Sequence, residues 1–330
     1  MASAAGAFQR LSTIAGPVIL PAIAYGAYKG NAAGALQSFF TGPGRTSRIV
    51  ALLVVWWNWK SLPLAWTTRV FNAMISHFLI RRFHNHSPDK LFHPVVTQTH
   101  VTLLEVDYNI HKSNSTYFAD LDVSRSHLVS HLFAKGCRAL GNNASTKIVM
   151  DPSDPSRPAK GKFGVMLGGV QCSFKKEIQP FQNYEMWSRV LSWDRKWMYI
   201  VTHFVEKGAS KPRKDGAEPM DWQKKVFASA VSKYVFKIGR LTIHPAVVIG
   251  ASDMLPERPG GWVAEENGFT TQPTANGHTA EDTTETWDWK RTEAERVKGL
   301  EYAIHLASLD GLLNRFDPAE TGPLGKFALG

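Results

Sequence analysis

The sequence lacks the residue patterns of several common enzyme classes. Its 330 residues include two cysteines, Cys137 and Cys172, which provide neither a disulfide framework nor the ligand spacing of a zinc site. No G-x-S-x-G, G-x-G-x-x-G or P-loop pattern occurs, so a serine-hydrolase elbow, a dinucleotide fold and P-loop chemistry have no support. We therefore expect no metal and no cofactor, and a reducing compartment rather than secretion.

The sequence also lacks an apolar run long enough to cross a membrane, and its first third has almost no acidic residues. The apolar stretches at 15–27 and 49–59 fall short of the roughly 20 residues that a spanning helix needs. Residues 1–95 contain nine lysines and arginines against one acid, which is +8 of the chain's net +10. A basic and apolar segment favours an anionic membrane surface as partner, and no nucleic-acid-binding motif occurs.

Three interpretations of residues 1–92 stay open. Tryptophans at 56, 57 and 59 beside Arg48 and Lys60 fit an interfacial belt, which predicts contact between residues 1–90 and a membrane surface. The same apolar helices could instead pack against the main domain or a dimer partner. The acid-poor, Ala- and Arg-containing start also fits an organelle-targeting peptide. We expect a location on the cytoplasmic side, with membrane association and organelle targeting both open.

The most informative stretch is residues 105–125, EVDYNIHKSNSTYFADLDVSR. Residues 95–106 before it are rich in β-branched side chains and predict a strand. Apolar residues after it recur at helical spacing and predict a long helix to about Leu140. Asp107 then lies near the strand end, and Asn114 lies near the helix N-terminus. A carboxylate facing a helix N-terminus can activate water for attack on a carbonyl, while the exposed N–H groups stabilise the oxyanion.

Two further patterns complete the expected domain. Asn114 and the serine before it can accept hydrogen bonds from the helix start. After the helix, period-2 apolar patterns and turn signals predict antiparallel strands at 146–150, 162–178, 184–193, 197–205 and 227–243. A bulge is expected at Gly168–Gly169, the proline-rich stretch 151–160 is expected to be a loop, and a helix is expected at 287–316.

The run from Asp107 to Phe118, DYNIHKSNSTYF, resembles the signature loop of hotdog-fold thioesterases of the 4-hydroxybenzoyl-CoA thioesterase type. Residues 178–204 are similar to the central strands of the thioesterase-like branch, which includes fungal secondary-metabolite-cluster proteins of the leucinostatin type. The resemblance covers about residues 95–255. It implies an α+β hotdog fold, an antiparallel sheet wrapped around a long central helix, with an N-terminal helical segment and a C-terminal helix added here.

The implied organisation has four parts. A basic apolar helical segment at 1–92 precedes the hotdog domain at 93–257. A flexible linker at 258–284 leads to a C-terminal helix and tail at 285–330. The domain would form homodimers or higher homo-oligomers, with the site between subunits.

The resemblance implies an acyl thioesterase that hydrolyses an acyl or polyketide thioester on coenzyme A or on a carrier protein. Asp107 would be the nucleophile or general base, and the Asn114 amide would hold the thioester oxygen. His111 would orient Asp107 or contact substrate, or its ring would pack beneath the loop. In the non-catalytic alternative, Asp107 is a loop or capping residue that only accepts hydrogen bonds from backbone N–H groups. The rival function is a non-catalytic hotdog protein that binds acyl chains or docks on a membrane.

Other carboxylates near the loop provide alternatives. Asp120 and Asp122 on the helix could supply the reactive group, as in some other hotdog branches, although such charges more often form a solvated face. Glu105 is expected two positions before Asp107 on the strand and on the same side. There it would raise the affinity of Asp107 for protons, which suits a base.

Overall fold

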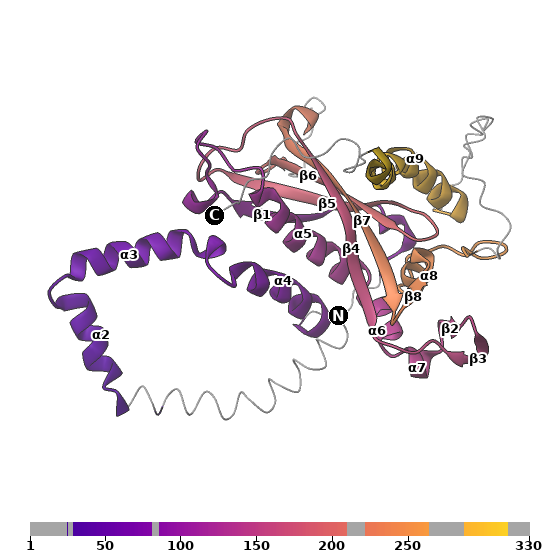
Figure 1. Cartoon of the computed structure of the whole chain (residues 1–330), viewed down its shortest axis with the longest axis horizontal. Helices are drawn as coiled ribbons and strands as arrows, with labels where there is room; N and C mark the ends of the chain where they lie inside the picture. The colour runs from indigo at the N-terminus through magenta and orange to yellow at the C-terminus, as the bar shows by residue number, and fades with distance from the viewer. Residues whose placement is uncertain (1–24, 26–28, 81–85, 210–221, 264–286, 316–330) are drawn as a thin grey trace.

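The structure is a computed structural model that describes residues 25, 29–80, 86–209, 222–263 and 287–315. The expectations for the apolar stretch 15–27, for most of the linker and for the tail after 315 therefore fall outside the described residues, apart from Tyr25. Within the described residues the chain forms a curved six-stranded antiparallel sheet with helices on both sides, and a separate two-stranded sheet (Figure 1).

The sheet is built from adjacent antiparallel strands. Its pairing order is β1 (Val95–His100), β5 (Asn183–Trp193), β6 (Met198–Glu206), β7 (Val226–Ile238) and β4 (Phe163–Phe174), and short β8 (Leu241–Ile243) pairs with β7. The pairing shifts register between Leu167 and Gly169, which confirms the predicted bulge. Only glycine fits there, because a Cβ on Gly168 would lie 2.2 Å from the Trp197 ring.

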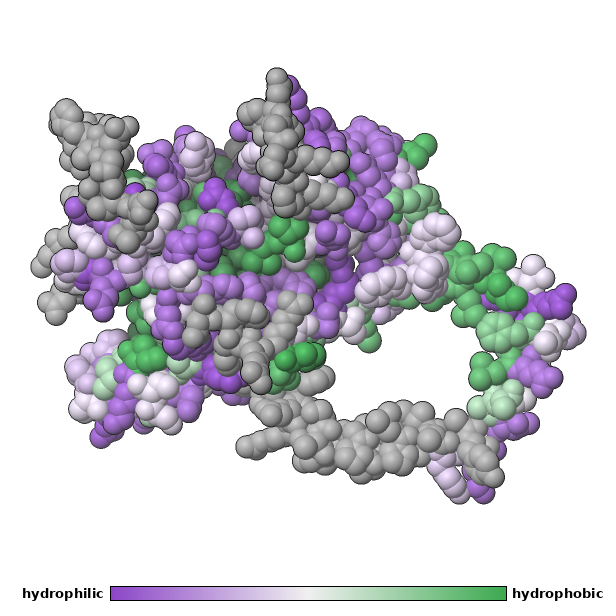
Figure 2. Space-filling view, turned by 180° about the vertical axis from the view of Figure 1, so that it is seen from behind, coloured by the Kyte–Doolittle hydropathy of each residue, from purple (hydrophilic) through white to green (hydrophobic). Residues whose placement is uncertain are grey.

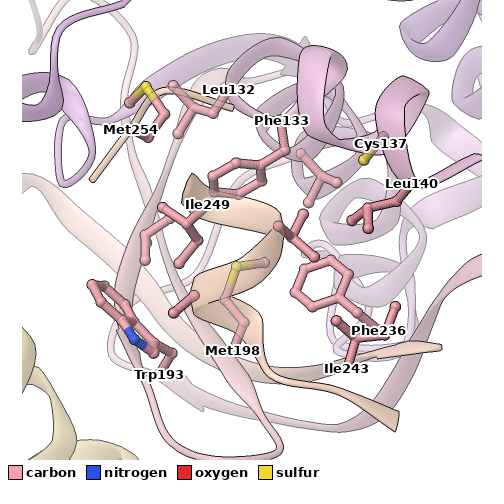
Figure 3. Close-up of a cluster of buried hydrophobic side chains, with 14 of the residues drawn as sticks. Leu132, Phe133, Cys137, Leu140, Trp193, Met198, Phe236, Ile243, Ile249 and Met254 are labelled. Atoms are coloured by element: carbon pink, nitrogen blue, oxygen red, sulfur yellow. The ribbon is translucent and has the colours of Figure 1, made fainter. Parts of the chain in front are cut away.

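The concave side of the sheet holds helix α5 (Thr116–Leu132), which confirms the α+β hotdog arrangement. One apolar cluster joins the second half of α5 and helix α6 (Ala134–Gly141) to the sheet and to α8 (Pro245–Gly250). Figure 3 shows Phe133 and Leu140 pointing from the helices toward Met198 and Phe236 of the strands. Burial of each such large side chain stabilises the fold by about 1.5–3 kcal/mol.

The predicted helix to Leu140 is interrupted. Phe133 leaves the helical conformation with φ −112° and ψ 17°, so α5 and α6 are separate helices. The interruption lets α6 approach the C-terminal end of α8 closely. At this contact, Gly136 N–H donates to Ser252 Oγ at 3.1 Å. A Cβ at Gly136 would lie 2.5 Å from the Val248 carbonyl oxygen. Helical periodicity alone does not reveal this contact.

Two strand predictions are wrong in part. β1 ends at His100 because Thr102 and Glu105 form a capping box around the 3₁₀ turn η4 (Leu103–Glu105). Residues expected as strand 146–150 contain the end of helix α7 (Asn143–Thr146), and the expected loop contains a hairpin of β2 (Met150–Asp151) and β3 (Asp154–Pro158). The Asn143 side chain holds this region by accepting from Val149 N–H at 2.9 Å and donating to the Ala159 carbonyl at 3.1 Å.

The C-terminal helix α9 (Trp289–Ala307) covers the convex side of β5. Arg296 donates to the Trp193 carbonyl at 2.8 Å, and Ser192 Oγ donates to the Arg296 carbonyl at 2.6 Å. The 3₁₀ helix η6 (Ser308–Arg315) follows, where Asp310 accepts from Lys233 at 2.8 Å. The predicted C-terminal helix is therefore part of the folded body.

The N-terminal helices divide into a packed part and a projecting part. Helix α4 (Ala65–Ile75), continued by the π-helical turn η2 (Ser76–Ile80), packs on α5. Helices α2 (Ala32–Thr41) and α3 (Arg45–Trp57) project from the body and contain no buried residue (Figure 1). The 3₁₀ turn η1 (Trp59–Ser61) joins the two parts. The expected boundary at residue 92 thus separates elements that contact one another.

Candidate active site

The candidate site is the loop 106–113 between η4 and α5, called here the Asp107 loop. Val106 and Lys112 form an isolated antiparallel bridge across its base. Asp107 N–H donates to the His111 carbonyl at 3.1 Å, and Ile110 N–H donates to the Asp107 carbonyl at 3.0 Å. Ile110 has a φ of 61°, a left-handed conformation that a branched residue adopts only where the surroundings impose it. The loop is therefore a tightly closed turn.

The Asp107 carboxylate is partly exposed, at 22% of its side-chain area. Its Oδ1 accepts the N–H of Asn109 at 3.0 Å. His111 Nδ1 lies 3.6 Å from the same oxygen, and His111 Nε2 lies 3.8 Å from Glu177 Oε1. His111 thus lies between two carboxylates at distances just beyond a hydrogen bond.

Asn114 is exposed and directly precedes Ser115, the N-cap residue of α5. The Ser115 side chain makes no capping hydrogen bond. Within the described part of the chain, the expected side-chain caps from Ser113 and Asn114 are absent too, and the Ser113 carbonyl instead accepts from Thr116 N–H at 3.0 Å. The start of α5 therefore has no side-chain cap, and its dipole and N–H groups can act on a bound oxygen.

The Asp107 loop also lies beside one edge of the sheet. Lys112 N–H donates to the Ile178 carbonyl at 2.9 Å, just beyond the end of β4. The Phe174 ring at that end packs edge-on against Tyr117 of α5, with 5.0 Å between ring centroids. No described strand pairs with the outer edge of β4. The loop and this free edge therefore form neighbouring surfaces.

A group of buried charges lies beneath the Asp107 loop, and sequence reasoning did not find it. Asp120 Oδ2 lies 2.9 Å from Lys112 Nζ and 3.3 Å from Lys60 Nζ, and Asp120 Oδ1 accepts from Arg69 at 2.9 Å. The Tyr184 hydroxyl donates to Asp120 Oδ2 at 2.5 Å. Together with Glu105 these residues are called here the ion cluster: Lys60, Arg69, Glu105, Lys112, Asp120 and Tyr184.

Glu105 has a different role from the one expected. It lies in the turn η4 and not on a strand, and it is 6% exposed. Its Oε1 lies 2.9 Å from Lys112 Nζ and its Oε2 lies 2.9 Å from Lys60 Nζ, while Oε2 also accepts from Thr102 N–H at 2.9 Å. The carboxylate is therefore held by two lysines inside the ion cluster, and the predicted strand position on the same side as Asp107 is wrong.

The alternative carboxylates on α5 are poorly placed for chemistry. Asp120 has no exposed area, and its two oxygens already accept from four donors. Asp122 is paired with Arg125 at 2.5 Å. Burial raises the pKa of the Cys137 thiol to about 12, so this cysteine stays protonated and is not a nucleophile. Asp107 is thus the exposed carboxylate of the stretch 105–125 that has no lysine or arginine partner in the described residues.

Charge and burial act in opposite directions within the ion cluster. Burial alone would raise the pKa of Asp120, but the charges of Lys60, Lys112 and Arg69 outweigh it and hold the pKa below its ordinary value. Burial lowers the pKa of Lys60, and the neighbouring carboxylates oppose that change. The cluster is stable only while both signs of charge are present.

A separate groove of about 550 Å³ lies between α4, α5 and β1. Its lining includes Lys60, Arg69 and all six residues of β1, but none of Asp107, His111 and Asn114. In the residues that the structure describes, no group of three or more histidine, cysteine or acidic side chains is arranged to hold a metal ion. Because none of the three predicted site residues lines it, the groove is distinct from the Asp107 loop.

The chain is similar to known thioesterases over most of its length. The thioesterase-like superfamily matches residues 101–236. The chain is 35% identical over 308 residues to the thioesterase poxG of Penicillium oxalicum, covering 89% of this chain and 94% of that protein. It is 33% identical over 285 residues to the probable thioesterase atnL of Emericella nidulans, covering 82% and 88%. A solved structure, the gentisyl-coenzyme A thioesterase BH1999, is 16% identical with a TM-score of 0.31, covering 48% and 98%.

Replacement of Asp120 by asparagine should destabilise the chain strongly. Asp120→Asn leaves the buried Lys60 and Lys112 and the half-buried Arg69 with one carboxylate, and we expect the free energy of unfolding in urea to fall by about 3–5 kcal/mol. The control Asp253→Asn removes an exposed pair with Lys135 and should cost at most about 1 kcal/mol.

The effect should depend on pH in a defined direction. Because the pKa of Asp120 is lowered by folding, its contribution is complete above about pH 4, the ordinary pKa of aspartate. The contribution is lost as the pH falls from the ordinary pKa of aspartate to the lowered pKa of Asp120 in the folded state. The difference between wild type and Asp120→Asn should therefore narrow below about pH 4, and a constant difference would contradict the assignment.

Proposed function

The chain belongs to the thioesterase-like superfamily, and from this membership we propose that it hydrolyses an acyl or polyketide thioester on coenzyme A or a carrier protein, with Asp107 as the reactive carboxylate. The single observation that supports Asp107 is its placement: a partly exposed carboxylate in the turn that leads to the uncapped start of α5. The named thioesterases of two fungi support the reaction class. We place the reaction in fungal secondary metabolism.

The proposed reaction needs one carboxylate and a few N–H donors. Asp107 accepts a proton from water as the water oxygen bonds to the thioester carbonyl carbon. The carbonyl oxygen becomes negatively charged, and the Asn114 amide together with the free N–H groups of α5 stabilises it. The carbonyl double bond then re-forms, the carbon–sulfur bond breaks, and the leaving thiolate takes up the proton from Asp107, which restores the carboxylate. Direct attack by Asp107, which forms an acyl anhydride that water then hydrolyses, needs the same groups.

We also propose that two copies associate through the outer edge of β4. This strand has twelve residues and one partner strand, β7. Met166, Leu167 and Phe174 are exposed along it, at 47%, 43% and 39%. A long free edge with exposed apolar side chains favours pairing with another chain. Because the Asp107 loop lies beside the end of β4, the partner would complete the wall of the site.

The N-terminal helix α3 supports a further part of the proposal, contact with a membrane surface. Its large apolar side chains are exposed on every side, from 38% at Ile49 to 71% at Trp56, and Figure 2 shows this apolar surface on the projecting arm. A helix that is apolar all round requires an apolar environment. No helix among the described residues is long and apolar enough to span a membrane. Since residues 29–80 contain no acid, α3 would lie along an anionic lipid surface.

Replacement of Asp107 by asparagine should abolish most of the activity. We expect kcat for thioester hydrolysis to fall by about 10²–10⁴-fold with little change in KM, because the variant cannot accept a proton. Free thiol release from a panel of acyl-CoA and acyl-carrier thioesters measures it. The matched control is Asp151→Asn, because Asp151 accepts Ser153 N–H at 2.9 Å in the same kind of turn.

The same measurement separates the hydrolase from its rival. Equal thiol release by wild type and Asp107→Asn would remove Asp107 from the reaction. If wild type releases no thiol from any thioester of the panel but binds acyl chains, the non-catalytic acyl-binding function is correct instead.

A charge on the β4 edge should separate the subunits. Leu167→Lys should raise the dimer dissociation constant by about tenfold or more, because it places a hydrated ammonium in the contact, and activity should fall with it. Light scattering over a concentration series measures the change. Val96→Lys, at a similarly exposed position on the other edge strand β1 (39%), is the control. Wild type that stays monomeric at every concentration would refute the proposal.

A charge on α3 should weaken lipid binding. Leu53→Glu should lower the partition coefficient into phosphatidylcholine–phosphatidylserine vesicles by about tenfold or more, because it removes an exposed apolar side chain that would insert into the lipid and because its charge is repelled by the anionic surface. Cosedimentation measures it. Leu309→Glu, at a comparably exposed leucine (43% against 52%), should bind as wild type does. Equal loss in both variants would show a nonspecific charge effect.

A further inference from the structure

The short segment that joins α3 to α4, residues 58–61, is called here the elbow. Three of its side chains bind the region of the turn η4, more than forty positions later in the sequence. Leu104 N–H donates to Asn58 Oδ1 at 3.1 Å. Lys60 Nζ lies 2.9 Å from Glu105 Oε2, and the hydroxyls of Ser61 and Thr102 are 2.7 Å apart. The elbow thus contacts η4 at two residues and its N-cap residue Thr102 at a third point.

These contacts are shielded from water, so each polar group depends on its partner. Asn58, Lys60, Thr102 and Glu105 are 3%, 5%, 0% and 6% exposed. Lys60 Nζ also donates to the His100 carbonyl at 2.6 Å, at the end of β1. One ammonium therefore joins the end of β1, the turn η4 and helix α5. A buried polar group that loses its partner keeps its full desolvation cost.

The turn η4 in turn holds both ends of the Asp107 loop. Glu105 lies two residues before Asp107, and its backbone carbonyl accepts from Ser113 N–H at 2.7 Å. Its side chain accepts from Lys112 Nζ at 2.9 Å. The loop therefore begins and ends on Glu105, and the second oxygen of that carboxylate is held by Lys60.

We propose that Lys60 is a positioning residue for the Asp107 loop, and that the elbow mechanically connects this loop to the projecting helix α3. The catalytic consequence rests on the proposed function of Asp107, whereas the structural consequence does not. Asn58 strengthens the connection, because its Nδ2 also donates to the Val54 carbonyl of α3 at 2.8 Å. The elbow is then part of the support of the Asp107 loop as well as the link to α3.

The test compares full-length wild type with Lys60→Met, which keeps the aliphatic stem and removes the charge. Amide hydrogen exchange in the loop 106–113 should become about tenfold faster or more, because the loop opens locally, while exchange in β6 stays unchanged. The kcat should fall by about tenfold to a hundredfold with little change in KM, because movement of the loop displaces the Asp107 carboxylate. The control Lys135→Met removes an exposed lysine paired with Asp253 and should match wild type in both measurements.

A double-mutant cycle with Glu105→Gln tests the route of the effect. If Lys60 acts through Glu105, the double variant should exchange in the loop no faster than the faster single variant, because residues in one network are not additive. Fully additive effects would overturn the route through Glu105. Unchanged loop exchange in Lys60→Met would overturn the inference itself, whatever the activity.

The two measurements separate this inference from the proposed function. Faster loop exchange without any loss of activity would support the positioning of the loop and refute Asp107 as the reactive group. If Lys60→Met does not fold, Lys60→Arg carries the test, since it keeps the charge but cannot place one nitrogen among all of its acceptors. If Lys60→Arg speeds exchange in loop 106–113 but not in β6, each compared with wild type, the inference is supported. If neither segment changes, the inference is overturned.

Discussion

The structure depends on how Asp120 is kept charged without water. Its carboxylate sits on the concave side of a sheet, on the helix that the sheet surrounds, with no exposed area. Three cations from three separate parts of the chain surround it: Lys60 of the elbow, Arg69 of α4 and Lys112 of the Asp107 loop. Desolvation of such charges is costly, and only close partners offset it. The requirement fixes these three segments relative to α5.

The concave side of the sheet therefore has two regions, one with apolar contacts and one with ionic contacts. Around Phe133 and Phe236 the contacts are apolar and tolerate small shifts, since burial is not directional (Figure 3). Around Asp120 the contacts are ionic and hydrogen-bonded, so they specify distances and directions. The Asp107 loop lies at the ionic end, beside the free edge of β4. The Asp107 carboxylate can therefore stay partly exposed while the ion cluster holds the turn that carries it.

The sheet and its turns were largely predictable from local pattern. The hairpin of β5 and β6 follows from alternating apolar residues around a polar turn, and the bulge at Gly168 follows from two adjacent glycines. Predictions failed where side-chain hydrogen bonds override the local apolar pattern. Glu105 ends the expected strand by capping η4 with the help of Lys60, and the close contact between Gly136 and α8 accompanies the division of one expected helix into two.

The sequence by itself determined a long helix followed by antiparallel strands, the acid-free apolar character of α3 and the position of Asp107 before the start of α5. These properties depend on residues near one another in the chain, so periodicity, turn residues and composition express them. Only the tertiary structure decided which charges meet. Lys60 and Arg69 look like solvated or lipid-facing cations in the sequence, and their role appears once the sheet brings them within 3.3 Å and 2.9 Å of Asp120. Pairing between residues more than fifty positions apart leaves no local pattern, because it is selected by the shape of the folded interior.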